Sequence, residues 1–569
     1  MKIIMMNRSW TMKIVKPLIA VFALYLMLIL ATGTAYSANL GESHYYYMLA
    51  VLAELENRWD DALVNYNEAI KNDPDSPYLK VQVSYIHLRL GSVEKAIAIN
   101  EQILKDNSNY LPSLKLLGEL YNSKSELKKA AKIYEKIIEL DPETTESYVF
   151  LGALYLTMKD HDNALKALAI LLSKSPDNMM ANYYTGLIYL EKRNLNQAEE
   201  YFNKTLSINP DFEYVHSYLG LIEELRNNNE KALEYYRKAL ELNPHNVKVR
   251  DRITNIYIQD KDLDKALDEL VHISKDIPDN VDVHIRIGLL YMEKEEYLKA
   301  IDEFMLVKSA SSTHVAARYY LSLAYEAINK MDKAIDELKD VIKIDPHHVN
   351  AFLRLGFLYS QIEDFVNASK YYEELLAFDK SKAEYFVYPA LTYMEMNKYA
   401  EAKTILLTGL NKYPKSDEIL FNLAVISEKQ DDFDTMVKYL KKVIEVNPKN
   451  ADALNYLGYS YTEKGINLDE AYSLIIRAMN EKPDSGYIID SLGWVYFRRG
   501  MYNDALRELL RATELVEEDA VLYEHLGETY LKLNMKDKAL EAFKKAIKYY
   551  KDEKGLVDRV TKRIKELLP

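Results

Sequence analysis

The amino-acid sequence predicts an all-α, right-handed superhelical solenoid of about 15 helix-turn-helix repeats, without a β-sheet. Three observations support this prediction. Small residues recur at a constant interval through most of the chain, as at Ala62, Ala96 and Ala130, and prolines recur at a fixed distance after them. Glycine and proline are also scarce, at 17 and 15 of 569 residues. A fixed period of roughly 34 residues is typical of helical hairpins that bury their apolar faces against their neighbours.

Residues 1–37 have the order of a secretory signal. Basic residues come first, a short apolar run over residues 18–31 follows, and small residues end the segment. Ala35 and Ser37 fit the −3 and −1 positions of a cleavage site before Ala38. The basic residues that precede the apolar run are Lys2, Arg8, Lys13 and Lys16.

The same segment has a second interpretation, as an N-terminal membrane anchor over residues 14–36. Cleavage is favoured because a membrane-spanning helix needs about 20 apolar residues. In both interpretations the basic residues lie before the run, which places the rest of the chain outside the cytoplasm. We therefore expect an exported, periplasmic protein, with the inner membrane as the alternative. Met1 and Met12 both stay open as the start of the chain.

The repeats are expected over residues 43–552. An alanine recurs with the period of the repeat from Ala62 to Ala402 without a change of phase. A small residue, often glycine, lies at a fixed distance before the alanines, and proline often lies at the same distance after them. One extra residue then enters at residues 465–467, after which the period resumes with Ala471, Ala505 and Ala539.

One unit, residues 213–246, shows how the pattern specifies a hairpin. Apolar residues recur at helical spacing over residues 218–225 and again over 232–240, on either side of a polar turn. Gly220 and Ala232 are small because the two helices are expected to cross closely there. Tyr236 is expected to fill the gap to the next unit. Pro244 ends the second helix, because proline disfavours helix in the residue before it.

This pattern resembles the tetratricopeptide repeat, which is named for its 34-residue unit. Fifteen units over residues 43–552 match it, and residues 553–569 are expected to form a C-terminal capping helix. The resemblance implies a concave groove that is lined by the first helix of each unit. It also implies that a protein or peptide partner binds in this groove.

Composition and motifs exclude most kinds of chemistry. The formal net charge of −14 is unsuited to neutralising phosphates, so we expect no nucleic-acid partner. The chain has no cysteine, which excludes disulfides, thiolate metal sites and a Cys-linked lipid anchor. It also lacks a glycine-rich phosphate loop, a zinc-binding helix motif and a nucleophile elbow. We expect a protein that is not an enzyme and has no metal or cofactor, while its oligomeric state stays open.

No other adjacent pair of repeats collects as many large aromatic residues, with a tryptophan among them, at the groove-lining positions that the resemblance implies as repeats 13 and 14 do. Tyrosine and tryptophan are good binding anchors because they bury a large area at a low entropic cost. The alternative is that these rings fill the joint at the extra residue. The candidate partner-binding residues are Tyr456, Tyr459, Tyr487, Trp494 and Phe497, with Asp490 and Arg498 one helical turn from Trp494 on either side.

A second candidate surface is basic. Arg252, Arg286 and Arg354 stand at the sixth position of the first helix in repeats 7, 8 and 10. Arginine binds carboxylate groups through paired hydrogen bonds, so these residues suit an acidic partner. The alternative is that each arginine pairs with a neighbouring Asp or Glu of the array.

The segment from Asn455 to Leu515 carries a narrower resemblance. Its sequences LGY and DSLGWVYFRRG are similar to the closing repeats of large exported bacterial repeat proteins, some of them outer-membrane adaptor lipoproteins. This implies a scaffold or adaptor in the bacterial cell envelope. The alternative is a regulatory or targeting subunit of an envelope enzyme, such as a processing protease or polysaccharide synthesis and export machinery. Without a lipidation cysteine, any membrane contact would come through the N-terminal segment or a partner.

Overall fold

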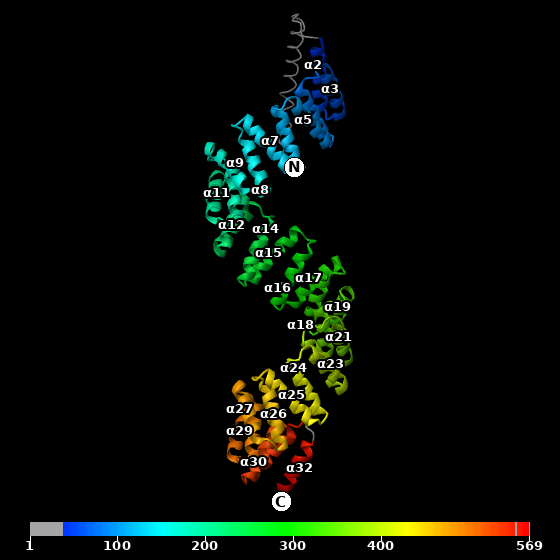
Figure 1. Cartoon of the computed structure of the whole chain (residues 1–569), viewed down its shortest axis with the longest axis vertical. Coiled ribbons are helices and arrows are strands. Elements are labelled where there is room, and N and C mark those ends of the chain that lie inside the picture. Colours follow the sequence, from blue (N-terminus) through cyan, green and yellow to red (C-terminus); the bar gives the residue numbers. More distant parts are fainter. Residues whose placement is uncertain (1–37, 552–554, 568–569) are drawn as a thin grey trace. The chain divides into compact units, whose positions relative to one another are not determined.

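The computed structural model describes residues 38–551 and 555–567. Within these residues it contains 31 α-helices and no strand, as the sequence predicts (Figure 1). Consecutive helices pair into helix-turn-helix units, which confirms the predicted fold class. The expected signal or anchor over residues 1–37 lies outside the described residues. The handedness predicted for the whole array stays a prediction.

The helices divide into two units, residues 38–262 and the described residues after 262. The helices of unit 1 are α2 (Ala38–Leu55), α3 (Trp59–Asn72), α4 (Pro77–Arg89), α5 (Val93–Asp106), α6 (Leu111–Ser123), α7 (Leu127–Leu140), α8 (Thr145–Thr157), α9 (His161–Lys174), α10 (Met179–Glu191), α11 (Leu195–Ile208), α12 (Glu213–Leu225), α13 (Asn229–Leu242) and α14 (Val247–Gln259).

Unit 2 continues the same alternation of first and second helices. It ends with a single helix, α32, which occupies the place expected for the capping helix. The helices are α15 (Leu263–Asp276), α16 (Val281–Glu293), α17 (Tyr297–Ala310), α18 (Val315–Ala327), α19 (Met331–Ile344), α20 (Val349–Gln361), α21 (Phe365–Phe378), α22 (Glu384–Glu395), α23 (Tyr399–Lys412), α24 (Asp417–Lys429), α25 (Phe433–Val446), α26 (Ala451–Lys464), α27 (Leu468–Glu481), α28 (Gly486–Arg498), α29 (Tyr502–Leu515), α30 (Ala520–Lys532), α31 (Lys536–Lys548) and α32 (Leu556–Leu567).

In most repeats the two helices cross at a glycine of the first helix. In the pair α12 and α13, a Cβ atom on Gly220 would lie only 2.5 Å from the ring of Tyr236. Tyr236 and Ala232 are both fully buried. Glycine is required here because a larger residue would push the aromatic ring out of the joint. The close approach expected at Gly220 is thereby confirmed. The Tyr236 ring fills the joint within its own unit, and its expected contact with the next unit stays a prediction.

The turn between the two helices depends on one residue with positive φ. This residue recurs with the period of the repeat from Asn57 to Asp431, with φ near 60° except at Gly91, where it is 74°. A left-handed residue ends the first helix and reverses the chain within a short turn. The extra residue of the sequence lies in this turn of the α26–α27 pair, where both Gly465 and Asn467 have positive φ.

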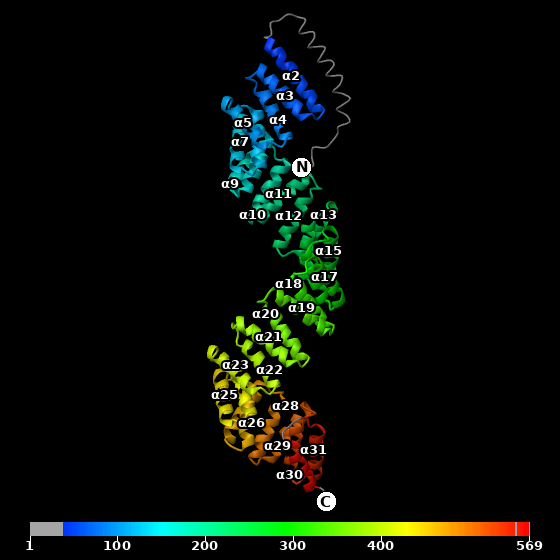
Figure 2. The same cartoon turned by 90° about the vertical axis from the view of Figure 1, so that its right-hand side faces the viewer.

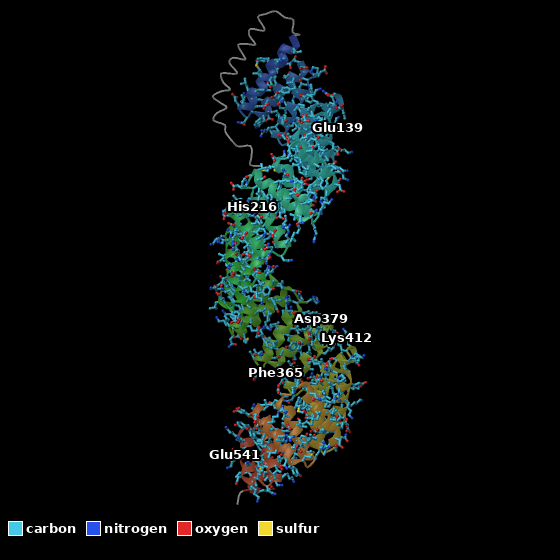
Figure 3. All side chains as sticks on the ribbon, turned by 90° about the vertical axis from the view of Figure 1, so that its left-hand side faces the viewer. Glu139, His216, Phe365, Asp379, Lys412 and Glu541 are labelled. Atoms are coloured by element: carbon cyan, nitrogen blue, oxygen red, sulfur yellow. The ribbon has the colours of Figure 1, made fainter. Side chains whose placement is uncertain are left out.

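A polar side chain near the start of the first helix ties it to the preceding segment. Each donates to a backbone carbonyl six residues earlier, most often that of a proline. The donors are Asn182, His216, Arg250, His284 and Arg318, and the carbonyls belong to Pro176, Pro210, Pro244, Pro278 and Ser312. His216, labelled in Figure 3, donates through Nε2 at 2.8 Å, which requires the neutral ring to carry its proton on that atom. Sequence analysis missed this recurring bond.

The crossing gives a first testable prediction. Replacement of Gly220 by alanine should destabilise the α12–α13 pair by about 1–3 kcal/mol, because the new methyl group overlaps the Tyr236 ring. In an open helix the same change stabilises by up to about 1 kcal/mol. Hydrogen exchange of the α12 and α13 amides measures the effect. Gly41→Ala in α2, where nothing lies within 4 Å of the added atom, is the matched control. Slower exchange of the α12 and α13 amides in Gly220→Ala, like the slower exchange expected of the α2 amides in Gly41→Ala, would contradict the prediction.

Candidate partner-binding site

The first helices at the C-terminal end of unit 2 surround a hollow of about 530 Å³. Figure 2 shows α28 and α30 in this part of the chain. Aromatic residues and carboxylates both line the hollow, and basic residues of α32 lie at its edge. The lining residues include Tyr459 and Glu463 of α26, Trp494 of α28, Glu524, His525 and Glu528 of α30, and Arg559 and Arg563 of α32.

Trp494 is the centre of a stack of three rings. The His525 ring is nearly parallel to it with ring centroids 4.0 Å apart, and the Phe497 ring is parallel at 4.6 Å. Two rings cannot both lie that close on one face without overlapping, so they cover opposite faces of the indole. The indole N–H donates to the Glu463 side chain. Trp494 therefore joins α26, α28 and α30, and only part of its edge is open to a partner.

Asp490 and His525 form a buried pair that sequence analysis did not predict. His525 Nδ1 lies 2.9 Å from Asp490 Oδ1, and the two residues are only 3% and 8% exposed. Burial opposes protonation of His525, but the charge and hydrogen bond of Asp490, with Glu463 and Glu524 nearby, outweigh it and raise its pKa. Asp490 therefore links α28 to α30 instead of lying on an open rim.

Two arginines of α32 bind carboxylates of α30 through paired hydrogen bonds. Arg559 donates to both oxygens of Glu524 at 2.7 Å, and Arg563 donates to both oxygens of Glu528 at 2.5 and 3.0 Å. The spacing of four residues in both helices places these pairs one helical turn apart. The sequence holds a signal for these pairs, because Glu524 and Glu528 have the same four-residue spacing as Arg559 and Arg563. Sequence analysis missed the pairs because α32 lies outside the repeat period.

The other aromatic candidates differ in exposure. Tyr487 is 60% exposed, and of the predicted aromatic residues it is the one that a partner can cover most. Tyr459 is partly buried, and burial followed by the charges of Glu463 and Asp490 raises its pKa well above the usual range. Tyr456 donates to Glu428 on the neighbouring first helix. Arg498 donates to the backbone carbonyl of Glu463 at 3.1 Å and so closes the end of α26.

The three candidate arginines belong to different parts of the chain. In unit 1, Arg252 lies 3.2 Å from Glu224 of the preceding first helix. In unit 2, Arg354 lies 2.6 Å from Glu326 of the preceding first helix, and Arg286 is on α16. Arg252 and Arg354 each pair with a glutamate 28 residues earlier. Arg252 and Arg354 therefore pair with glutamates of the array, which was the alternative to binding an acidic partner.

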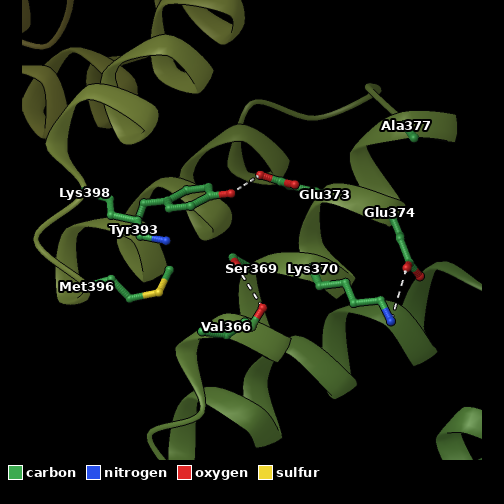
Figure 4. A pocket seen from close by; sticks show the side chains of 9 residues that line it. All are labelled: Val366, Ser369, Lys370, Glu373, Glu374, Ala377, Tyr393, Met396 and Lys398. Atoms are coloured by element: carbon green, nitrogen blue, oxygen red, sulfur yellow. Dashed lines mark hydrogen bonds and ion pairs between the residues drawn. The ribbon is translucent and has the colours of Figure 1, made fainter.

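A second hollow, of about 520 Å³, lies beside the second helix α21 (Figure 4). Among the residues that line it, Tyr393 is the one aromatic side chain, whereas Tyr459 and Trp494 both line the first hollow. Tyr393 donates to Glu373 at 2.7 Å, which together with burial raises the pKa of Tyr393 to about 12. Lys370 lies 3.9 Å from Glu374. The aromatic hollow near Trp494 is therefore the better candidate for partner binding.

Neither a metal site nor a membrane-spanning helix is found in the described residues. Over residues 38–551 and 555–567, no group of three or more His, Asp or Glu side chains could hold a metal ion. No helix of the same ranges is long and apolar enough to cross a membrane.

Four family models match the chain, each described as a tetratricopeptide repeat. They match residues 47–112 and 151–213, residues 113–144, residues 214–246 and residues 308–556. Together with the paired helices, these matches decide the family. The chain is an array of tetratricopeptide repeats.

Two curated proteins resemble parts of this tetratricopeptide repeat array. TPR repeat-containing protein PA4667 of Pseudomonas aeruginosa is 38% identical over 120 residues, which is 21% of this chain and 20% of that protein. The SPINDLY protein of Hordeum vulgare, a probable UDP-N-acetylglucosamine–peptide N-acetylglucosaminyltransferase, is 26% identical over 26% of this chain and 16% of that protein. The chain thus spans no more than a fifth of the length of either relative.

Three solved structures with similar helical repeats align with different shares of this chain. The APC/C hetero-tetramer Cut9–Hcn1 has 14% identity and a TM-score of 0.36, over 85% of this chain and 95% of that one. The C-terminal part of a TPR repeat-containing protein from Cytophaga hutchinsonii has 16% identity and a TM-score of 0.38, over 42% and 97%. YrrB, described as a TPR protein with an unusual peptide-binding site, has 20% identity and a TM-score of 0.29, over 32% and 95%.

The Asp490–His525 pair of these repeats should stabilise the protein in a pH-dependent way. Because the folded pKa of His525 is raised, its contribution is complete below about pH 6.5, the ordinary value, and is lost as the pH rises through the folded pKa. Asp490→Asn should therefore lower the free energy of local opening of α28 and α30 by about 1–3 kcal/mol at pH 6, and by less at pH 9.

Hydrogen exchange of the α28 and α30 amides at the two pH values measures this difference. Asp452→Asn is the control, because Asp452 forms an exposed ion pair with Lys482 at 2.8 Å and should contribute little. A loss that is equal at both pH values, or larger at pH 9, would exclude the assigned role of His525.

Proposed function

We propose that this protein is an exported scaffold or adaptor that binds a protein or peptide partner in the bacterial cell envelope. Tetratricopeptide repeats are typically non-catalytic, and the array takes up nearly all of the described residues. The observation that best supports partner binding is the exposed Tyr487 on α28, the helix that also carries Trp494 of the aromatic hollow. The basic and apolar order of residues 1–37 supports export.

A regulatory or targeting subunit of an envelope enzyme is the second candidate function. The resemblance of residues 455–515 to the closing repeats of exported adaptor proteins favours it. The two functions differ in whether the activity of one enzyme depends on this protein. Deletion of the protein should lower the activity of a captured protease or polysaccharide-synthesis enzyme if the second function is correct, and leave it unchanged if the first is.

Capture of partners from bacterial membranes tests the proposed location in the cell envelope. Full-length tagged protein should recover envelope proteins, identified by mass spectrometry. Its N-terminus should be at Ala38 if the signal is cleaved, whereas an intact N-terminus in the membrane fraction would identify an anchor. Recovery of cytoplasmic proteins alone, together with an intact N-terminus in the cytosol, would exclude an envelope function.

Two substitutions should separate binding from stability. Tyr487→Ala should weaken partner binding by about tenfold, or 1.4 kcal/mol, and leave the melting temperature unchanged because the side chain is 60% exposed. Trp494→Ala should weaken binding and also lower the melting temperature, because it removes the ring stack and the bond to Glu463. Titration calorimetry and thermal unfolding measure the two effects. Unchanged affinity in both variants would place the partner elsewhere.

A further inference from the structure

The first helices α22, α24, α26 and α28 carry an apolar strip along unit 2. We define this strip by the ninth residue of each repeat, Leu391, Val425, Tyr459 and Trp494. Leu391 is 42% exposed, and the other three side chains are partly buried. In unit 1 the ninth positions are also mostly apolar, but polar residues interrupt them at Glu119 and Asn255.

Direct contacts between the four helices make the strip continuous. Helix α22 packs against α24, and α26 packs against α28. Between these pairs, the rings of Phe421 and Tyr456 lie 5.9 Å apart, and Tyr456 donates to Glu428 of α24. A partner segment that crosses the four helices can therefore contact apolar side chains on each of them.

One edge of the strip carries negative charge that the array neutralises only in part. Glu384 and Glu418 stand at the second position of their repeats, on α22 and α24. Burial, followed by the charges of Glu384 and Asp417, raises the pKa of Glu418. Glu384 has Lys382 at 3.3 Å, whereas Glu418 forms no ion pair with any residue of the described ranges. The two carboxylates repel each other and lack a shared cation.

The same two carboxylates lie close to the apolar strip. Burial, followed by the charges of Glu384 and Glu418, raises the pKa of Tyr388, so this tyrosine is near both. Leu391 is three residues after Tyr388 on α22 and thus on the same helical face. The opposite edge is mixed in charge, because Glu395, Glu428 and Glu463 alternate with Lys429 and Lys464.

We propose that the strip binds a partner segment that is both apolar and cationic, with a lysine or arginine entering between Glu384 and Glu418. This inference rests on the proposed partner binding in the groove and names the chemistry of the partner. A cation at that position relieves the repulsion between the two carboxylates and keeps both of them charged. The apolar side chains of the segment then cover Leu391 and the rings toward Trp494.

Three labelled peptides of equal length, added to the full-length protein, test this chemistry. One alternates Lys and Leu, one alternates Glu and Leu, and one alternates Lys and Ser. The Lys/Leu peptide should bind at least tenfold more tightly than either of the others in a fluorescence anisotropy titration. Equal binding of the Glu/Leu peptide would exclude the charge assignment, and equal binding of the Lys/Ser peptide would exclude the apolar strip.

Matched variants test whether the Lys/Leu peptide binds on the strip. Glu384→Gln combined with Glu418→Gln should weaken the Lys/Leu peptide at least fivefold, and Leu391→Ser should do the same. The control is Glu234→Gln combined with Glu514→Gln, which removes the same charge from exposed positions on the second helices α13 and α29. Equal weakening in the control would show that only the net charge of −14 attracts the peptide, and the proposal would be wrong.

The two failures can be told apart. If no Lys/Leu peptide binds, but a captured envelope protein binds and is lost in Tyr487→Ala, the scaffold function stands and the cationic chemistry is wrong. If the peptide binds with the expected dependence on Glu384 and Glu418, but no envelope protein is captured, the chemistry of the groove stands and the envelope function is wrong.

Discussion

The close crossing of the two helices in each repeat is the constraint on which the other features of the structure depend. A glycine such as Gly220 removes the side chain from one helix, so that a large residue such as Tyr236 can fill the joint from the other. The crossing buries one face of both helices and, with the left-handed turn residue, fixes their orientation. Each pair then presents the same unburied face to its neighbour, and a neighbour of the same kind can cover it.

This constraint also explains why we propose the binding surface on the first helices. Their inner side packs on the second helices, while residues at the ninth position lie on the opposite side, where no further helix of the repeat covers them. On α22, α24, α26 and α28 these residues are apolar. Lateral contacts between first helices, such as Arg354 with Glu326 and Tyr456 with Glu428, fix the spacing of the surface. The helices are therefore in position before a partner arrives, which lowers the entropic cost of binding.

The sequence was sufficient to predict the fold because nearly every repeat has the same spacing of small, apolar and turn residues. The period, the small residues at the crossing and the extra residue at 465–467 were all readable without the structure. The candidate site was less predictable. The His525 stack on Trp494 and the Asp490–His525 pair join residues that are far apart in the sequence, across the interrupted period. Their partners depend on side-chain rotamers at one joint, which a repeating pattern does not specify.

Hydrogen exchange of the full-length protein, with and without a captured partner, tests the central claim that partners bind on the first helices of unit 2. The account predicts slower exchange in α22, α24, α26 and α28, with little change in the second helices α23, α25 and α27. Slower exchange confined to the second helices, or to unit 1, would contradict it.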